Sequence, residues 1–333
     1  MKVVITGGAG FIGRRLARRL LERGTLAGPD GRQQAIDALV LFDVAPPQLP
    51  LDEDRRLQFV IGDVADRAAI GRLAAGAATV FHFAAVVSAE AEADMDKGLR
   101  VNLDGTRAVL EACRALGTAP RFIYSSSLAV YGGDLPPAVS DDTPLRPQTS
   151  YGAHKAIGEL LVGDYTRKGF IDGRALRLST IVVRPGRPNR AASTWVSSIF
   201  REPLAGAQVI CPVTRQSAMA LLSPRRLMAA IELLHDMPGE RLGADRTVLL
   251  PGITATVSEM VEALRRAGGD AAVARIRWEP DPAIQRIVDG WPRAIIAKRA
   301  ERLGIAADAD VDAIVQAFVE DDLAAQKALV AAG

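Results

Sequence analysis

The chain of 333 residues is long enough for two domains of roughly 150 residues each. Hydrophobic residues make up 49% of it and charged residues 24%, a globular composition that excludes a disordered chain. Lys and Arg together number 41 and Asp and Glu 39, so the formal charge of +2 gives no reason to expect a nucleic-acid partner.

The few cysteines and the hydropathy pattern narrow the class of protein further. The 2 cysteines and 3 histidines show no close Cys/His spacing, so we expect neither a disulfide framework nor a metal site. No uncharged apolar run is long enough to span a membrane, and the chain opens on a strand pattern rather than on a signal peptide. We therefore expect a cytoplasmic protein with no membrane partner.

The first half of the chain alternates β-branched runs with segments of helical period. We expect strands at residues 2–6, 39–43, 58–61, 79–84, 121–125 and 174–183. The clearest helices are expected at residues 11–23, 105–116 and 150–167. Alternation of this kind is typical of βαβ units, and it predicts an α/β fold with a doubly wound parallel sheet.

Pro-rich turns break this rhythm from about residue 185 onward, which predicts a second, smaller domain of mixed α/β structure that binds the substrate. Further strands are expected at 218–223 and 248–250, and further helices at 224–235 and 257–267. The expected dinucleotide-binding domain covers residues 1–183 with a return at about 216–253. The expected substrate domain covers residues 184–215 and 254–333.

A glycine-rich turn follows the first predicted strand directly. Gly7, Gly10 and Gly13 are three residues apart, and the first helix begins inside the turn. Such a turn lets a pyrophosphate approach the backbone at the positive end of the helix, and in this strand–turn–helix context it predicts a Rossmann-type dinucleotide site. The residues expected to contact the cofactor here are Gly7, Gly10, Phe11 and Ile12.

Asp43 ends the second predicted strand, where a carboxylate can accept both hydrogen bonds of an adenosine ribose and would repel a 2′-phosphate. The cofactor is therefore expected to be NAD rather than NADP. Asp43 lies thirty residues past Gly13, against about twenty in the usual motif. We interpret residues 24–32 as an inserted loop that accounts for the difference.

The ends of the third and fourth predicted strands carry the next expected cofactor contacts. Asp63 and Val64 follow the third strand, where a carboxylate can reach the adenine amino group. Ala84 and Ala85 follow the fourth strand and are small enough for the cofactor to lie against the backbone.

Tyr151 and Lys155 are four residues apart at the start of a predicted helix and so share one face. A tyrosine hydroxyl has a pKa of about 10 unaided. An adjacent ammonium and an oxidised nicotinamide both lower that pKa, which would make Tyr151 a base. The segment 125–127 (SSS) ends the fifth predicted strand, at the edge where a doubly wound sheet binds ligands, so a hydroxyl there can hold the substrate oxygen.

Together these segments resemble the extended short-chain dehydrogenase/reductases, a superfamily that includes nucleotide-sugar epimerases and dehydratases. The resemblance covers essentially the whole chain and is carried by residues 6–13, 62–63, 102, 125–127, 131–132 and 151–155. It implies that Ser127 is the catalytic serine, that Tyr151 is the base and that Lys155 is its partner. It also implies that Ser126 lies against nicotinamide or substrate, and that Asn102 steadies the site.

A narrower resemblance is to the D-erythronate dehydrogenases, carried by residues 84–93 (AAVVSAEAEA), 150–164, 184–193 (RPGRPNRAAS), 278–282 (WEPDP) and 291–292 (WP). It implies NAD-dependent oxidation of the C2 hydroxyl of a four-carbon sugar acid to a ketone. Two related alternatives remain, a nucleotide-sugar epimerase or dehydratase and a dehydrogenase of another acid such as a threonate or uronate. A cofactor-sensing protein without chemistry is less favoured, because such proteins often lack the Tyr–Lys pair.

An acidic substrate agrees with three arginines after the sixth predicted strand. Arg184, Arg187 and Arg190 can each grip a carboxylate through a charge-assisted pair, and Arg190 is the first choice, with Arg184 second. Ser88, just past the fourth strand, is expected to hydrogen-bond substrate hydroxyls. The sugar acid is expected to bind between the two domains.

Two expectations lie outside this site. His82 falls within a predicted strand and is expected to be a packed core residue rather than a catalytic one. By analogy with the superfamily, the helices at 105–116 and 150–167 are candidates for the contact surface of a homodimer.

Overall fold

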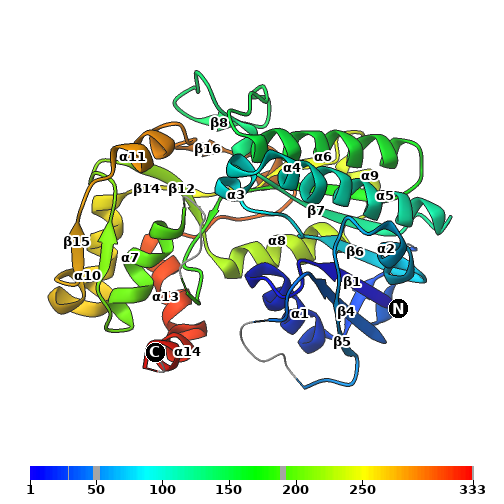
Figure 1. Cartoon of the computed structure of the whole chain (residues 1–333), viewed down its shortest axis with the longest axis horizontal. Helices are drawn as coiled ribbons and strands as arrows, with labels where there is room; N and C mark the ends of the chain where they lie inside the picture. Colours follow the sequence, from blue (N-terminus) through cyan, green and yellow to red (C-terminus); the bar gives the residue numbers. More distant parts are fainter. Residues whose placement is uncertain (29, 48–52, 188–192, 332–333) are drawn as a thin grey trace. The chain divides into compact units, whose positions relative to one another are not determined.

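The computed structural model describes residues 1–28, 30–47, 53–187 and 193–331 (Figure 1). The chain forms two compact units. The first comprises Met1–Val130, Thr149–Arg177 and Met228–Val248, and the second comprises Tyr131–Gln148, Leu178–Leu227 and Leu249–Gly333. The domain boundaries expected from the sequence stay a prediction, because a compact unit is not thereby a domain that folds alone.

A seven-stranded sheet forms the centre of the first unit. Its order is β13 (Thr247–Leu249), β9 (Asp172–Leu178), β7 (Arg121–Ser127), β6 (Ala77–His82), β1 (Lys2–Thr6), β4 (Ala38–Asp43) and β5 (Leu57–Ile61). The pairs β1–β4, β4–β5, β1–β6 and β6–β7 are parallel. The strand order reverses direction between β1 and β6, which is where such sheets bind ligands. The expected doubly wound parallel sheet is confirmed.

Helices cover both faces of this sheet, as the alternation of strand residues requires. In β6, Val80 packs in one apolar cluster with Val109 of α5 (Gly105–Ala115) and with residues of α2 (Arg67–Ala74) and α6 (Ser150–Arg167). Thr79, which points to the opposite face, hydrogen-bonds His235 of α8 (Pro224–Asp236). Ion pairs such as Arg19–Glu232 join α8 to α1 (Phe11–Arg23) on that side.

Two segments differ from the expected pattern. At the segment 24–32, interpreted as an inserted loop, the structure has a hairpin, formed by β2 (Thr25–Ala27) and β3 (Gln33–Ala35). A π-helical segment, Leu99–Asp104, leads directly into α5. The short helices α3 (Ser88–Ala93) and α4 (Met95–Gly98) and a 3-10 turn at Leu128–Val130 complete the first unit.

The second unit has its own apolar core, built by helices and short strands. Its strands form the sheet β10 (Thr180–Ile181), β12 (Ala218–Leu222) and β14 (Ile253–Thr256), the parallel pair β11 (Val209–Cys211) and β15 (Ile276–Trp278), and the parallel pair β8 (Val139–Ser140) and β16 (Ile295–Ile296). Its helices are α7 (Thr194–Leu204), α10 (Val257–Val273), α11 (Pro282–Asp289), α12 (Lys298–Arg302), α13 (Val311–Asp321) and α14 (Leu323–Ala331). The remaining helix, α9 (Gly239–Leu242), belongs to the first unit.

None of the helices in the described ranges combines the length and apolar character needed to cross a membrane.

Candidate functional site

The glycine turn between β1 and α1 is closely packed against neighbouring backbone. Gly7 has φ +69°, and a Cβ there would lie 2.7 Å from the backbone nitrogen of Ala84. A Cβ on Gly13 would lie 2.4 Å from the backbone oxygen of Gly7. Helix α1 begins at Phe11, and among the described residues no side chain caps it at Gly10. Its first N–H groups therefore remain available to a phosphate.

Asp43 lies beside this turn at the end of β4. Its Oδ2 accepts a hydrogen bond of 3.0 Å from the backbone N–H of Ala9, and its Oδ1 accepts one of 2.8 Å from Val44. The hairpin β2–β3 is inserted between α1 and β4, so it supplies the extra residues between Gly13 and Asp43. The carboxylate thus reaches the glycine turn despite the unusual spacing.

Asp63 and Val64 follow β5. Asp63 accepts a hydrogen bond of 2.9 Å from the backbone N–H of Ala65 and forms an ion pair with Arg100. Val64 is buried, and a Cβ on Gly105 would approach its side chain to 2.6 Å. Val64 therefore packs against α5, and its contact with a cofactor would be through the backbone. The adenine contact of Asp63 stays a prediction.

A buried histidine links the ends of β1 and β6. His82 Nδ1 lies 2.7 Å from Thr6 Oγ1, and its Nε2 lies 2.9 Å from Thr106 Oγ1. Because the Thr106 hydroxyl donates to the backbone oxygen of Asn102, we assign the His82 proton to Nε2. Burial, and to a lesser extent Lys155, lowers the pKa of His82 to about 3. His82 is therefore a neutral core residue, as expected.

Asn102 fixes the segment that follows β6. Its Oδ1 accepts a hydrogen bond of 2.8 Å from the backbone N–H of Val86, and its Nδ2 donates one of 3.2 Å to the oxygen of the same residue. The N–H of Ala84 donates to Thr6 Oγ1 at 3.3 Å. Ala84 and Ala85, expected to lie against the cofactor, are thus in a segment whose backbone is held at both ends.

Tyr151 and Lys155 lie in the first turns of α6, which Thr149 caps by accepting a hydrogen bond from Gly152 N–H at 3.1 Å. Lys155 Nζ donates a hydrogen bond of 2.7 Å to the backbone oxygen of Ser125 and lies 5.6 Å from the centre of the Tyr151 ring. Burial lowers the pKa of Lys155 to about 7, while Glu159 acts in the opposite direction. The structure therefore brings the expected base, its amine and the end of β7 together.

The three serines at the end of β7 have different surroundings. Ser127 Oγ accepts a hydrogen bond of 3.1 Å from the N–H of Ala129 and keeps its own proton to donate. Ser126 is 1% exposed, and its hydroxyl donates to Glu159 at 2.5 Å. The expected contact of Ser126 with substrate stays a prediction, and its hydroxyl is engaged elsewhere in this structure. Ser88, half-buried, begins α3, whose Glu92 accepts a hydrogen bond from Ser150 N–H at the start of α6.

Two of the three expected carboxylate-binding arginines, Arg184 and Arg187, belong to the second unit. Arg184 Nη2 lies 3.3 Å from Ser193 Oγ, and its backbone oxygen accepts a hydrogen bond of 2.7 Å from Arg201. Arg187 is exposed. Arg190, the first choice, lies outside the described residues.

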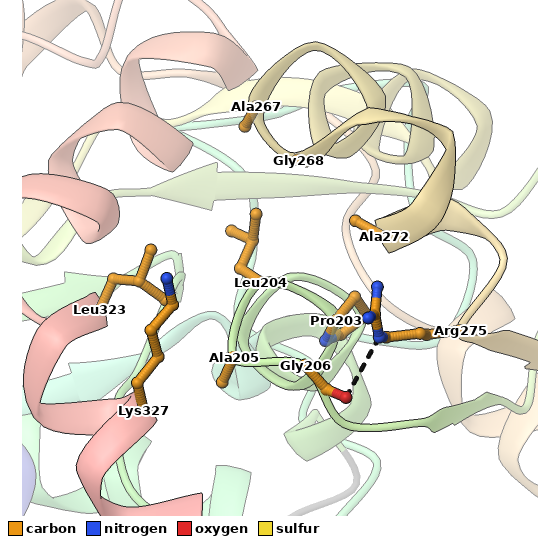
Figure 2. A pocket seen from close by; sticks show the side chains of 10 residues that line it. All are labelled: Pro203, Leu204, Ala205, Gly206, Ala267, Gly268, Ala272, Arg275, Leu323 and Lys327. Carbon is orange, nitrogen blue, oxygen red and sulfur yellow. Dashed lines mark hydrogen bonds between the residues drawn. The ribbon is translucent and has the colours of Figure 1, made fainter.

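The second unit also contains a cavity of about 370 Å³ (Figure 2). It is lined by Pro203, Leu204, Ala205, Gly206, Ala267, Gly268, Ala272, Arg275, Leu323 and Lys327. The Arg275 side chain donates to the backbone oxygen of Gly206 at 3.1 Å. None of the site residues expected from the sequence is among this lining.

Sequence reasoning missed the buried residues that support the site. Thr6 and Thr106 gave no signal, because a hydroxyl that fixes a histidine has no characteristic spacing. Glu159 had one: it follows Lys155 by four residues, as Lys155 follows Tyr151, and so shares their face of α6.

Residues 3–222 match the model of the NAD dependent epimerase/dehydratase family. The chain belongs to this family. It is 53% identical to a D-erythronate dehydrogenase of Cupriavidus necator, over 96% of this chain and 98% of that protein. It is 41% identical to a D-erythronate dehydrogenase of Haemophilus influenzae, over 97% of this chain and all of that protein.

A solved structure of a nucleoside-diphosphate-sugar epimerase from Agrobacterium tumefaciens superposes with a TM-score of 0.91 at 40% identity. The match covers 97% of this chain and 95% of that one. The similarity to these proteins therefore extends over the second unit, beyond the residues that the family model matches.

The first unit fits the NAD of this family. The backbone approach at Gly7 and Gly13 leaves no space for side chains, and the start of α1 offers uncapped N–H groups to a pyrophosphate. Asp43, held beside the turn, has the acceptor atoms for a ribose diol and the charge that disfavours a 2′-phosphate.

Proposed function

We propose that the protein is an NAD-dependent dehydrogenase that oxidises the C2 hydroxyl of D-erythronate to give 2-dehydro-D-erythronate. The observation that carries the proposal is the 53% identity to a D-erythronate dehydrogenase over nearly the full length of both chains. The structure supports the chemistry, because Tyr151 and Lys155 lie at the end of β7 in the same unit as the glycine turn.

Three side chains carry out the proton chemistry of the proposed reaction. Tyr151, in its phenolate form, accepts the proton of the substrate hydroxyl, and Ser127 donates a hydrogen bond to the oxygen of that hydroxyl. Lys155 favours the phenolate through its positive charge. Bound NAD supplies the hydride acceptor for the C2 hydrogen.

We propose that an arginine of the second unit binds the substrate carboxylate. Arg190 remains the first candidate and Arg184 the second, because a guanidinium forms two charge-assisted hydrogen bonds to a carboxylate. Ser88 is proposed to bind a substrate hydroxyl. Gly7, Gly10, Phe11, Ile12, Asp43, Asp63, Val64, Ala84, Ala85 and Asn102, with Tyr151 and Lys155, are proposed to contact NAD.

The test is NADH formation with a panel of four- to six-carbon sugar acids, each offered with NAD and with NADP. We expect D-erythronate with NAD to give the highest kcat/KM. A higher kcat/KM with a threonate or uronate would identify that acid as the substrate and leave the proposed reaction class unchanged. Protein that is purified with tightly held NAD(H), and that releases no NADH with any acid, would instead indicate an epimerase or dehydratase.

We further propose a cytoplasmic location and a homodimer. Both Cys113 and Cys211 are free thiols in the structure, as expected in a reducing compartment. Ile157 and Leu160 of α6 are 39% and 72% exposed and lie on one stripe of the helix, which suits a contact with a second copy.

A further inference from the structure

A buried ion pair lies on α6 and β9 beside the proposed proton-transfer residues, and the proposed mechanism does not use it. Arg177 Nη2 lies 2.7 Å from Glu159 Oε2, and Arg177 Nε lies 2.9 Å from Oε1. The side chain of Glu159 is 4% exposed and that of Arg177 is 12% exposed. Ser126 donates the third hydrogen bond to the carboxylate. Both oxygens of a buried carboxylate are thus satisfied.

Two structural links connect this carboxylate to the expected base. Tyr151, Lys155 and Glu159 are spaced four residues apart and share the face of α6 that packs on β7. On β7, Ser126 lies between Ser125, whose backbone oxygen holds Lys155, and Ser127. Glu159 therefore lies on the helix face that carries Tyr151 and Lys155, and it contacts the strand that carries Ser127.

Lys155 needs a negative charge near it in order to remain an ammonium. It is 2% exposed, and its hydrogen-bond partners are the neutral backbone oxygen and hydroxyl of Ser125. Burial lowers the pKa of Lys155 to about 7, and Glu159 is the charge that acts in the opposite direction. A neutral amine would lose its ability to favour a phenolate.

The other titratable groups around Lys155 do not supply that charge. Those that contact it or act on it are Tyr151 and His154 on α6, Tyr124 on β7 and His82 on β6. The carboxylates of neighbouring helices are engaged elsewhere, Glu90 with Lys97, Glu92 with Ser150 N–H, and Glu111 with Tyr165 and Arg114. Glu159 is also paired, with Arg177, but unlike these carboxylates it lies on the same face of α6 as Lys155, and it is the charge that raises the pKa of Lys155.

We propose that Glu159 is a positioning residue for Lys155, and that its carboxylate, held by Arg177 and Ser126, favours the ammonium form of the buried amine near neutral pH. Arg177 fixes the carboxylate in one orientation, and Ser126 ties it to the strand that holds Lys155. The inference rests on the proposed function only where Tyr151 is concerned, because the protonation of Lys155 can be measured without turnover.

The primary test is a pH titration of the lysine side chains by NMR in wild type and in Glu159→Gln, both without substrate. The chain has 6 lysines, so Cε labelling gives few signals, and loss of one signal in Lys155→Arg assigns it. Gln keeps the shape and an acceptor oxygen but removes the charge. We expect the Lys155 midpoint to fall by roughly one pH unit or more. An unchanged midpoint would overturn the proposal.

Matched variants separate charge from packing. Glu159→Asp keeps the charge and should leave the Lys155 midpoint close to that of wild type. Ser126→Ala removes a hydrogen bond but no charge and should also leave it in place. A fall in the midpoint as large in these two variants as in Glu159→Gln would show that packing, and not the charge, determines the protonation of Lys155.

If Glu159→Gln does not fold because Arg177 is left unpaired, the double variant Glu159→Gln with Arg177→Gln leaves neither charge buried alone. The charge that raises the pKa of Lys155 is that of Glu159, so the midpoint should still fall. An unchanged midpoint in this variant would equally contradict the proposal.

The pH profile of kcat/KM should shift in the opposite direction to the Lys155 midpoint. With Lys155 neutral, the Tyr151 phenolate is less favoured, so the acidic limb of kcat/KM against pH should move to higher pH in Glu159→Gln. A merely structural defect would lower kcat/KM equally at every pH. A wild type that forms no NADH from any sugar acid would refute the proposed function, while the NMR titration would still decide the role of Glu159.

Discussion

The amine of Lys155 and the backbone oxygen of Ser125 are joined by a hydrogen bond of 2.7 Å. This bond connects the first turns of α6 to the end of β7, two elements separated in the chain by the whole segment 128–149. It holds Tyr151, which shares the helix face of Lys155, at the strand end that carries Ser127. The proposed base and the proposed oxygen-binding hydroxyl are therefore placed by one buried contact.

Replacing Tyr151 with Phe removes the hydroxyl that accepts the substrate proton and keeps the ring. We expect kcat for D-erythronate oxidation to fall about 10²- to 10⁴-fold, the range of a general base. Binding of NAD, titrated by fluorescence, should change little. Tyr165→Phe, on the same helix but bonded to Glu111, is the matched control and should turn over like wild type. Wild-type turnover by Tyr151→Phe would remove Tyr151 from the mechanism.

Gly13→Ala should weaken both folding and NAD binding. The new Cβ would lie 2.4 Å from Gly7 oxygen and 2.8 Å from Gly8 Cα, both backbone atoms that cannot turn aside. We expect the free energy of unfolding in urea to fall by about 1–3 kcal/mol, as in overpacked sites. Gly71→Ala in α2 is the control, because among the described residues no atom outside the adjoining helix backbone lies within 4 Å of its Cβ. It should stabilise the protein by up to about 1 kcal/mol. Equal effects at the two positions would contradict the close packing of the turn.

Three buried histidines should make the protein sensitive to mild acid, since burial also lowers the pKa of His154. Burial lowers the pKa of His82 to about 3 and that of His235 to about 4, the latter against the opposing effect of Asp236. Below the unfolded value of about 6.5, the unfolded chain binds protons that the native chain does not. The stabilisation is therefore complete above pH 6.5 and is lost progressively as the pH falls toward the native values.

The measurement is the free energy of unfolding in urea at pH 7, 6 and 5. We expect a decrease of up to about 1.4 kcal/mol per pH unit for each histidine. His235→Gln should reduce the slope by about a third to a half, even if it lowers stability at every pH. A slope between pH 6 and 5 that this variant leaves unchanged would mean that His235 is protonated alike in the folded and unfolded states.

The regular elements of the first unit were predictable because their periods are long enough to recognise. Helix α6 begins and ends at the expected residues 150 and 167. The strands β1, β4, β5, β6 and β7 lie within two residues of their predicted positions. The predicted strand 174–183 was wrong in one respect. It divides into β9 and β10, which belong to different sheets, and an apolar run does not reveal which neighbours it pairs with.

The site was predictable where a motif sets the spacing and not where tertiary contacts decide. The glycine turn and the Tyr–Lys spacing could be identified in the sequence. The surroundings of Ser126 could not, because β7 continues to Ser127, two residues past the predicted end, and its alternation turns Ser126 toward α6. Strands of two or three residues such as β11 and β16 are too short to show any period.

Replacing Arg184, Arg187 and Arg190 one at a time with Gln identifies the group that binds the carboxylate. Loss of a charge-assisted hydrogen bond costs about 1.5–3 kcal/mol, so one variant should raise the KM for D-erythronate about 10- to 100-fold while its KM for NAD changes little. We expect that variant to be Arg190→Gln. Arg184→Gln should instead lower stability, because it removes the contact with Ser193. A neutral polyol of the same length separates the two effects: the carboxylate-binding arginine should matter for the acid and not for the polyol. If no variant distinguishes acid from polyol, the carboxylate is bound by a residue outside this segment.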